Sequence, residues 1–141
     1  MKLEKIPSTV FDIMNKLVSV DGSCSVKESA EIMLCNNIGS IIVTEKEKPI
    51  GIVTKSDLLS RVIVEGKDSS KTEIRDIMST PLITIEKDEN ILEAIRFMRK
   101  KNVSRLIVTD NEKILGIISE TDLIRAIQLS SLTSFSTLLH K

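Results

Sequence analysis

The chain has 141 residues, with 20 basic side chains against 20 acidic ones and a formal net charge of zero. Its composition, 41% hydrophobic and 28% charged, is that of a globular domain with a substantial core. The balanced charge argues against a polyanionic partner, and no apolar run approaches the roughly 18 residues that a membrane span needs. Residues 1–11 do not resemble a signal peptide, so we expect a cytoplasmic protein.

Side chains that carry metal-site or nucleophilic chemistry are scarce. Two cysteines, Cys24 and Cys35, stand eleven residues apart, and the only histidine is His140, next to the C-terminus. We expect no metal site, no disulfide and no catalytic residue, because a Ser/His or Cys/His pair would need that terminal histidine. Three phenylalanines, without tryptophan or tyrosine, also offer little for stacking on nucleic-acid bases. An enzyme is therefore not expected.

In chain order, the first half predicts a strand, a helix, a hairpin of two strands and a second helix. The expected strands are 17–20, 41–44 and 50–53, and the expected helices are 26–34 and a segment from Ser56 or Asp57 onward. A polar, charged linker follows at 65–73.

The second half predicts the same order of elements. The expected strands are 82–85, 106–108 and 115–118, and the expected helices are 91–101 and 121–128. The tail at 129–141 is rich in serine and threonine, with apolar residues at helical spacing. These are Leu132, Phe135, Leu138 and Leu139. Both a short docking helix and a frayed end remain open for this tail.

The two halves are copies of each other. Asp12-Ile13-Met14 recurs as Asp76-Ile77-Met78, and the segment 51–58 lies over 116–123. One copy has too little core to be stable alone, so the copies should pack about a pseudo-twofold axis. We therefore expect an α/β (α+β) fold of two tandem β-α-β-β-α repeats. The repeats are placed at 8–64 and 74–128, with the linker at 65–73 and the tail at 129–141.

The segments 51–57 and 116–122 are where the sequence suggests chemistry. In each, a strand runs into a helix through Thr54-x-x-Asp57 or Ser119-x-x-Asp122. One explanation is structural, because both fit a capping box between hydroxyl, carboxylate and backbone N–H groups. The other is a nucleotide site, because a helix N-terminus attracts phosphate and a carboxylate can accept hydrogen bonds from both ribose hydroxyls. Both explanations remain open.

The repeated pattern resembles tandem CBS domains, which are named from cystathionine beta-synthase and paired in a Bateman module. The resemblance rests on the Asp-x-Met openings and on a Gly-h-x-Thr/Ser-x-x-Asp signature in both halves, where h is apolar, and it covers residues 8–128. It implies a regulatory module that holds adenosyl ligands (AMP, ADP, ATP, S-adenosylmethionine or a relative) in two clefts between the repeats. It also implies a homodimer that acts on a separate effector protein, without a cofactor.

The resemblance further implies which residues hold the ligand. Asp57 and Asp122 would bind ribose hydroxyls, and the hydroxyl side chains of the two turns would bind phosphate; these are Thr54, Ser56, Ser119 and Thr121. The Asp122 cleft would take its adenine-facing wall from 16–18 and 38–40, and the Asp57 cleft from 78–83 and 103–105. The wall residues singled out are Lys16, Val18, Ile38, Gly39, Ser40, Met78, Thr80, Pro81, Ile83, Ser104 and Arg105.

The copies differ at one charged position. Arg105 stands where basic residues of nucleotide-binding CBS domains reach phosphate, whereas its counterpart is Ser40. An arginine offers phosphate a forked, charge-assisted contact that serine cannot, so we expect two unequal sites. The alternative is that Arg105 is a solvated basic residue near the end of the 91–101 helix.

Two other functions remain open. A protein-interaction or dimerisation module could keep the capping boxes without a ligand, and its melting temperature would then not respond to nucleotides. A nucleic-acid-binding protein could use the basic cluster from Arg96 to Arg105, and its binding would weaken steeply with salt.

Overall fold

The computed structural model describes residues 7–139, with side chains through residue 131. His140 and the side chains of residues 132–139, which include the apolar residues of the tail, lie outside the described part, so docking of the tail stays a prediction. Among the described residues, no helix is long and apolar enough to cross a membrane.

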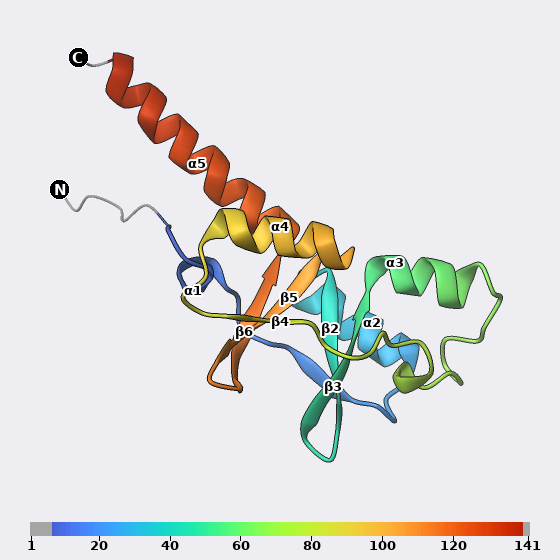
Figure 1. The fold of residues 1–141 in the computed structure, drawn as a ribbon. Helices are drawn as coiled ribbons and strands as arrows, with labels where there is room; N and C mark the ends of the chain where they lie inside the picture. Colours follow the sequence, from blue (N-terminus) through green and yellow to red (C-terminus); the bar gives the residue numbers. More distant parts are fainter. Residues whose placement is uncertain (1–6, 140–141) are drawn as a thin grey trace. The chain divides into compact units, whose positions relative to one another are not determined.

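The elements follow the predicted order twice (Figure 1). The first series is α1 (Val10–Ile13), β1 (Ser19–Asp21), α2 (Val26–Cys35), β2 (Ser40–Glu45), β3 (Lys48–Thr54), α3 (Lys55–Leu58), the π-helix η1 (Leu59–Ile63) and the 3-10 helix η2 (Ile74–Asp76). The second is β4 (Thr84–Glu86), α4 (Ile91–Lys101), β5 (Arg105–Asp110), β6 (Lys113–Ser119) and α5 (Glu120–Leu139). The mixed α/β fold with two three-stranded sheets is thereby confirmed.

The chain forms two compact units, and each holds one sheet. The β1–β3 unit spans Leu17–Leu82, and the β4–β6 unit combines Met1–Lys16 with Ile83–Lys141. In each sheet the first strand is parallel to the second, and the second pairs antiparallel with the third. The order of strands is therefore the order of the chain in both units.

Each unit takes a segment from the other repeat of the sequence. In the β1–β3 unit Ser79 bridges Ile52 on β3, and in the β4–β6 unit Asn15 bridges Ile117 on β6. Ser79 and Asn15 follow directly after the two Asp-Ile-Met openings, so the openings lie on the far edge of the opposite repeat's hairpin. We call residues 12–15 and 76–79 the opening segments.

The signature glycines are explained by this exchange. A Cβ at Gly116 would lie 2.6 Å from the backbone oxygen of Asn15, and a Cβ at Gly51 would lie 2.6 Å from the sulfur of Met78. Distances this short are far inside van der Waals contact. The glycines are therefore required by the close approach of the opening segments.

Each unit buries its own core of aliphatic side chains. Val10, from the first repeat of the sequence, is fully buried in the β4–β6 core, and Ile77 is fully buried in the β1–β3 core. Met14 and Met78 pack against these cores from partly buried positions. Packing of the opening segments thus contributes hydrophobic burial as well as hydrogen bonds.

Local signals explain the helix and hairpin ends. Asn90 caps α4 by accepting a hydrogen bond from the Glu93 backbone N–H at 2.8 Å, and Asn102 ends the helix with φ of 54°. The hairpins turn through Lys46–Glu47 and Asn111–Glu112, all four at positive φ. Two-residue turns of this kind match the twist of the strands that they connect.

The longest departure from the predicted elements is α5. Its backbone continues through the predicted tail to Leu139 as one helix that extends past α4 (Figure 1). The fraying that the serine and threonine content left open is not seen in the described backbone.

Candidate functional site

The first candidate site is the turn between β3 and α3. The Asp57 carboxylate accepts hydrogen bonds through Oδ2 from the Thr54 backbone N–H at 2.8 Å and from the Thr54 hydroxyl at 3.1 Å. The Asp57 backbone N–H in turn donates to the Thr54 hydroxyl oxygen at 3.3 Å. This reciprocal pair is a capping box that starts α3.

The second candidate site is the turn between β6 and α5, and its geometry is the same. Oδ2 of Asp122 accepts from the Ser119 backbone N–H at 3.0 Å and from the Ser119 hydroxyl at 2.7 Å, and the Asp122 N–H donates to that hydroxyl at 3.2 Å. The structural explanation of both turns is therefore confirmed.

The capping boxes occupy one carboxylate oxygen of each aspartate. Among the described residues, Oδ1 of Asp122 accepts no hydrogen bond, and Oδ1 of Asp57 forms an ion pair with Arg61, whose Nε lies at 3.8 Å. A carboxylate oxygen can accept further hydrogen bonds after one oxygen is committed to the backbone. Capping and ligand binding are thus compatible at the same residue.

Two residues that the sequence analysis did not single out contact these aspartates. The Asn15 side-chain amide donates to Oδ2 of Asp122 at 2.9 Å, and Arg61 forms its ion pair with Asp57. Arg61 follows Asp57 by four residues, a helical spacing that could have indicated the pair. Asn15 is distant in sequence from Asp122, so only the exchange of opening segments reveals it.

Arg105 lies at the start of β5, opposite Ser119 in the β5–β6 register. Its guanidinium donates to the Ser104 carbonyl at 3.1 Å and to the Ser104 hydroxyl at 2.9 Å. Partial burial lowers the pKa of Arg105 from its ordinary value, while the Asp122 and Glu120 carboxylates act in the opposite direction. Arg105 is therefore an ordered cation next to the Ser119–Asp122 turn, not a freely solvated side chain.

The predicted site residues are distributed over both units. The β1–β3 unit contains Val18, Ile38, Gly39, Ser40, Thr54, Ser56, Asp57, Met78, Thr80 and Pro81, and the β4–β6 unit contains Lys16, Ile83, Ser104, Arg105, Ser119, Thr121 and Asp122. Within each unit, the residue before the second strand is tied to the turn. The Lys55 N–H donates to the Gly39 carbonyl at 3.1 Å, and the Glu120 N–H donates to the Ser104 carbonyl at 2.9 Å.

Among the described residues of the β4–β6 unit, two pockets stand out. One, of about 320 Å³, is lined by Ser104 and Glu120 together with the end of α4, so it adjoins the Ser119–Asp122 turn. The other, of about 340 Å³, lies between β4 and α4 and includes none of the predicted site residues.

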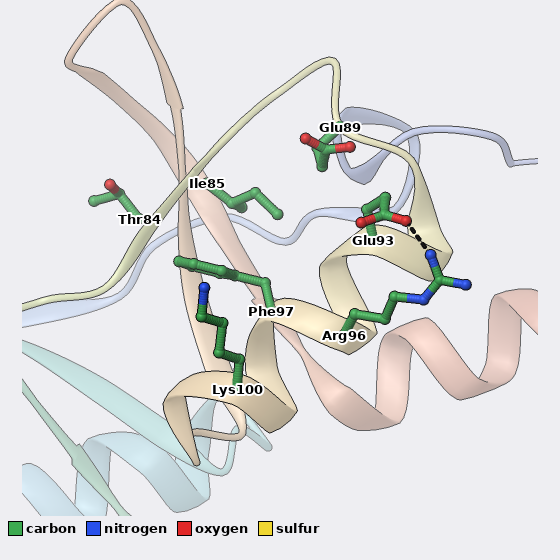
Figure 2. Close-up of a pocket in the computed structure, with 7 residues that line it drawn as sticks. All are labelled: Thr84, Ile85, Glu89, Glu93, Arg96, Phe97 and Lys100. Carbon is green, nitrogen blue, oxygen red and sulfur yellow. Dashed lines mark hydrogen bonds and ion pairs between the residues drawn. The ribbon is translucent and has the colours of Figure 1, made fainter.

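The pocket beside β4 carries charges of both signs. Figure 2 shows Glu89, Glu93 and Arg96 at one end and Phe97 and Lys100 at the other, with an ion pair between Glu93 and Arg96. Two members of the basic cluster, Arg96 and Lys100, thus face a pocket that acidic residues share. This mixed charge does not favour a polyanion at this pocket.

The described side chains do not form a metal-binding site. No group of three or more histidine, cysteine, aspartate or glutamate residues among them is placed to hold a metal ion. Cys24 and Cys35 are both free thiols.

Comparison with known proteins places the chain in a family. A model described as "CBS domain" matches residues 10–64 and again 74–129. An uncharacterized protein of Methanopyrus kandleri is 44% identical over 100 residues, which are 70% of this chain and 51% of that protein. The chain therefore spans about half the length of this relative.

Solved structures share the fold over most of the chain. The structure of a conserved protein from Pyrococcus horikoshii is 30% identical with a TM-score of 0.78, covering 86% of this chain and 93% of that one. A hexameric CBS-CP12 protein from bloom-forming cyanobacteria is 25% identical with a TM-score of 0.75, covering 82% and 70%. Two matches of the family model, in register with two copies of the same capped turn, show that this chain belongs to the CBS domain family as a tandem pair.

Proposed function

We propose that this protein is a regulatory module that binds adenosyl ligands at the two turn aspartates and acts on a separate partner protein. CBS-domain proteins are regulatory modules that often bind ligands. The observation that carries the proposal is the repeated turn itself. In both copies a helix N-terminus, a hydroxyl and a carboxylate with an oxygen outside the capping box occur together.

This combination suits a nucleoside better than a bare anion. A carboxylate repels phosphate but accepts hydrogen bonds from a vicinal diol, while backbone N–H and hydroxyl donors favour a phosphate nearby. Ser56 and Thr121 add hydroxyls within the first helical turn of α3 and α5. The wall residues assigned above by resemblance would complete the two sites.

The two sites are proposed to differ in strength. At Asp122 the second carboxylate oxygen is open to a ligand, and the ordered Arg105 cation lies nearby for phosphate. At Asp57 a ligand must compete with Arg61, and the residue equivalent to Arg105 is Ser40. We therefore assign the stronger nucleotide site to Asp122.

Regulation would follow from preferential binding to one arrangement of the chain. A ligand can shift an equilibrium only by its difference in affinity between two states. A homodimer is the proposed assembly, and the hexameric CBS-CP12 protein is an example of a CBS-domain protein that assembles into an oligomer.

Calorimetric titration with AMP, ADP, ATP, S-adenosylmethionine and methylthioadenosine tests the proposal. Wild type should bind at least one of them, and Asp122→Ala should weaken that binding more than Asp57→Ala. Asp88→Ala, which removes an exposed carboxylate outside both turns, is the matched control and should bind as wild type does. Absence of heat with every adenosyl ligand would overturn the proposal and leave a protein-interaction module.

A further inference from the structure

Both turn aspartates are connected to an opening segment, but through unrelated residues. In the β1–β3 unit the link is Arg61, which pairs with Asp57 and whose Nη1 donates to the carbonyls of Ile77 at 2.9 Å and Met78 at 3.1 Å. In the β4–β6 unit the link is Asn15, whose backbone bridges β6 and whose side chain donates to Asp122. The same connection therefore occurs twice.

Duplication alone does not explain this recurrence. The position equivalent to Arg61 is the buried Ala126, and the position equivalent to Asn15 is Ser79. A link made from non-equivalent residues in the two copies is not simply inherited from a common repeat. Its recurrence points to a role for the connection itself.

The opening segments are also where the chain leaves one unit for the other. Residues 76–79 belong to the β1–β3 unit, and four residues after Ser79, at Ile83, the chain enters the β4–β6 unit. Residues 12–15 lead in the same way to Leu17 and the β1–β3 unit. Whatever moves an opening segment therefore acts directly on the covalent connection between units.

We propose that Arg61 is a positioning residue that transmits ligand binding at Asp57 to the opening segment 76–79. The inference rests on the proposed function, which supplies a ligand for Asp57. Ribose hydroxyls that occupy Oδ1 of Asp57 compete with Arg61 Nε, which already lies 3.8 Å from that oxygen. The displaced guanidinium then holds the carbonyls of Ile77 and Met78 less firmly, and the opening segment loosens.

The Arg61 link is suited to such competition. Its side chain is 43% exposed, whereas that of Asp57 is 16% exposed, so the ion pair is partly screened and can be opened. The two carbonyl contacts are charge-assisted hydrogen bonds at ordinary length, so releasing them has a measurable effect on the segment. The Asn15 link has a neutral amide donor and uses Oδ2, so ligand at Oδ1 of Asp122 does not compete with it in the same way.

Hydrogen–deuterium exchange on the full chain tests the inference, with AMP and ATP as the probes. In wild type, saturating nucleotide should accelerate exchange of the Ile77 and Ser79 amides. Arg61→Ala should show about tenfold faster exchange there without nucleotide, as expected for loss of hydrogen bonds to a charged donor, and no further acceleration with it. Arg125→Ala, an exposed arginine of α5, should behave as wild type.

A second variant distinguishes loss of the Arg61 link from general destabilisation of the fold. Arg61→Lys keeps the charge but not the forked donor geometry, so it should restore part of the nucleotide response. A nucleotide response that is unchanged in both Arg61 variants, or absent in a wild type that binds nucleotide, would overturn the inference alone. Absence of nucleotide binding by wild type in a parallel calorimetric titration would overturn the proposed function and this inference together.

Discussion

The Thr54–Asp57 turn and the Ser119–Asp122 turn have the same backbone and different surroundings. Both form a complete capping box, and both rest on a glycine that accommodates an opening segment. Around them, however, Arg61 approaches one aspartate, while Asn15 and the charge of Arg105 act on the other.

The two turns share the residues that set the backbone and differ in the charges that surround the carboxylates. Residues that set the backbone are retained in both copies, because a change there disturbs strand, turn and helix together. Charges around the carboxylates have diverged, because the backbone tolerates them. If the two turns bind ligands, their affinities should differ even though their backbones do not.

The largest expected effect concerns the two glycines. Gly116→Ala places a Cβ against the Asn15 backbone oxygen, whereas Gly51→Ala first meets the flexible Met78 side chain and then the Ser79 carbonyl at 3.0 Å. Urea unfolding should show a loss of about 3 kcal/mol for Gly116→Ala and about 1 kcal/mol for Gly51→Ala. Equal losses would mean that the opening segments are packed equally in both units.

The next effect concerns Arg105 and phosphate. Arg105→Ser, which makes this position identical to Ser40, should reduce affinity for ATP about tenfold through loss of a charge-assisted contact and leave affinity for adenosine unchanged. Competition binding with the two ligands measures this difference. A parallel loss for both ligands would indicate that Arg105 supports the turn and does not reach phosphate.

A smaller effect is expected at the hairpin turns, where the two units should respond alike. Glu47 and Glu112 adopt φ of 64° and 73°, a backbone conformation that is strained for residues with a Cβ. Glu47→Gly and Glu112→Gly should each stabilise the protein by about 0.5 kcal/mol in thermal unfolding, the relief of strain being partly offset by the entropy of glycine. Stabilisation in only one unit would reveal an asymmetry that the backbone does not show.

The smallest effect is a pH dependence of the free energy of unfolding that arises in the β1–β3 unit. Hydrogen bonds from the Ser23 hydroxyl and backbone N–H hold the pKa of Asp21 below its ordinary value of 3.8. Because the folded-state pKa is the lower one, this stabilisation is present at neutral pH and is lost as the pH falls below 3.8.

Ser23→Ala removes the hydroxyl donor and tests this dependence. The variant should unfold at slightly lower urea than wild type at pH 7, and the difference should shrink as the pH falls below 3.8. A difference that is independent of pH would assign the effect to packing of the hydroxyl. The equivalent residue in the β4–β6 unit is Asp88, which cannot donate in this way once ionised.

Prediction from the sequence succeeded where local patterns decide the structure. Helix α4 has the bounds that were predicted, and both capping boxes were identified from their hydroxyl and acid spacing. Resemblance to CBS domains was confirmed by the family matches, whereas the ligand-binding roles assigned through it stay predictions.

Sequence patterns could not predict that each opening segment packs on the hairpin of the other repeat. Asn15 and Asp122 are 107 residues apart, and no periodicity connects a short polar residue to a distant carboxylate. Arg61 is different, because its helical spacing from Asp57 was visible, but its contacts with the Ile77 and Met78 carbonyls depend on the tertiary fold. The length of α5 was underestimated because serine and threonine have modest helix propensity.

The most direct test of two unequal adenosyl sites is the ligand-induced thermal shift of wild type, Asp57→Ala and Asp122→Ala. A ligand at a hundredfold its dissociation constant should raise the melting temperature of wild type by roughly 5 to 10 °C. We predict that Asp122→Ala removes most of this shift and that Asp57→Ala only reduces it. No shift with any adenosyl ligand, or equal shifts in both variants, would contradict the account.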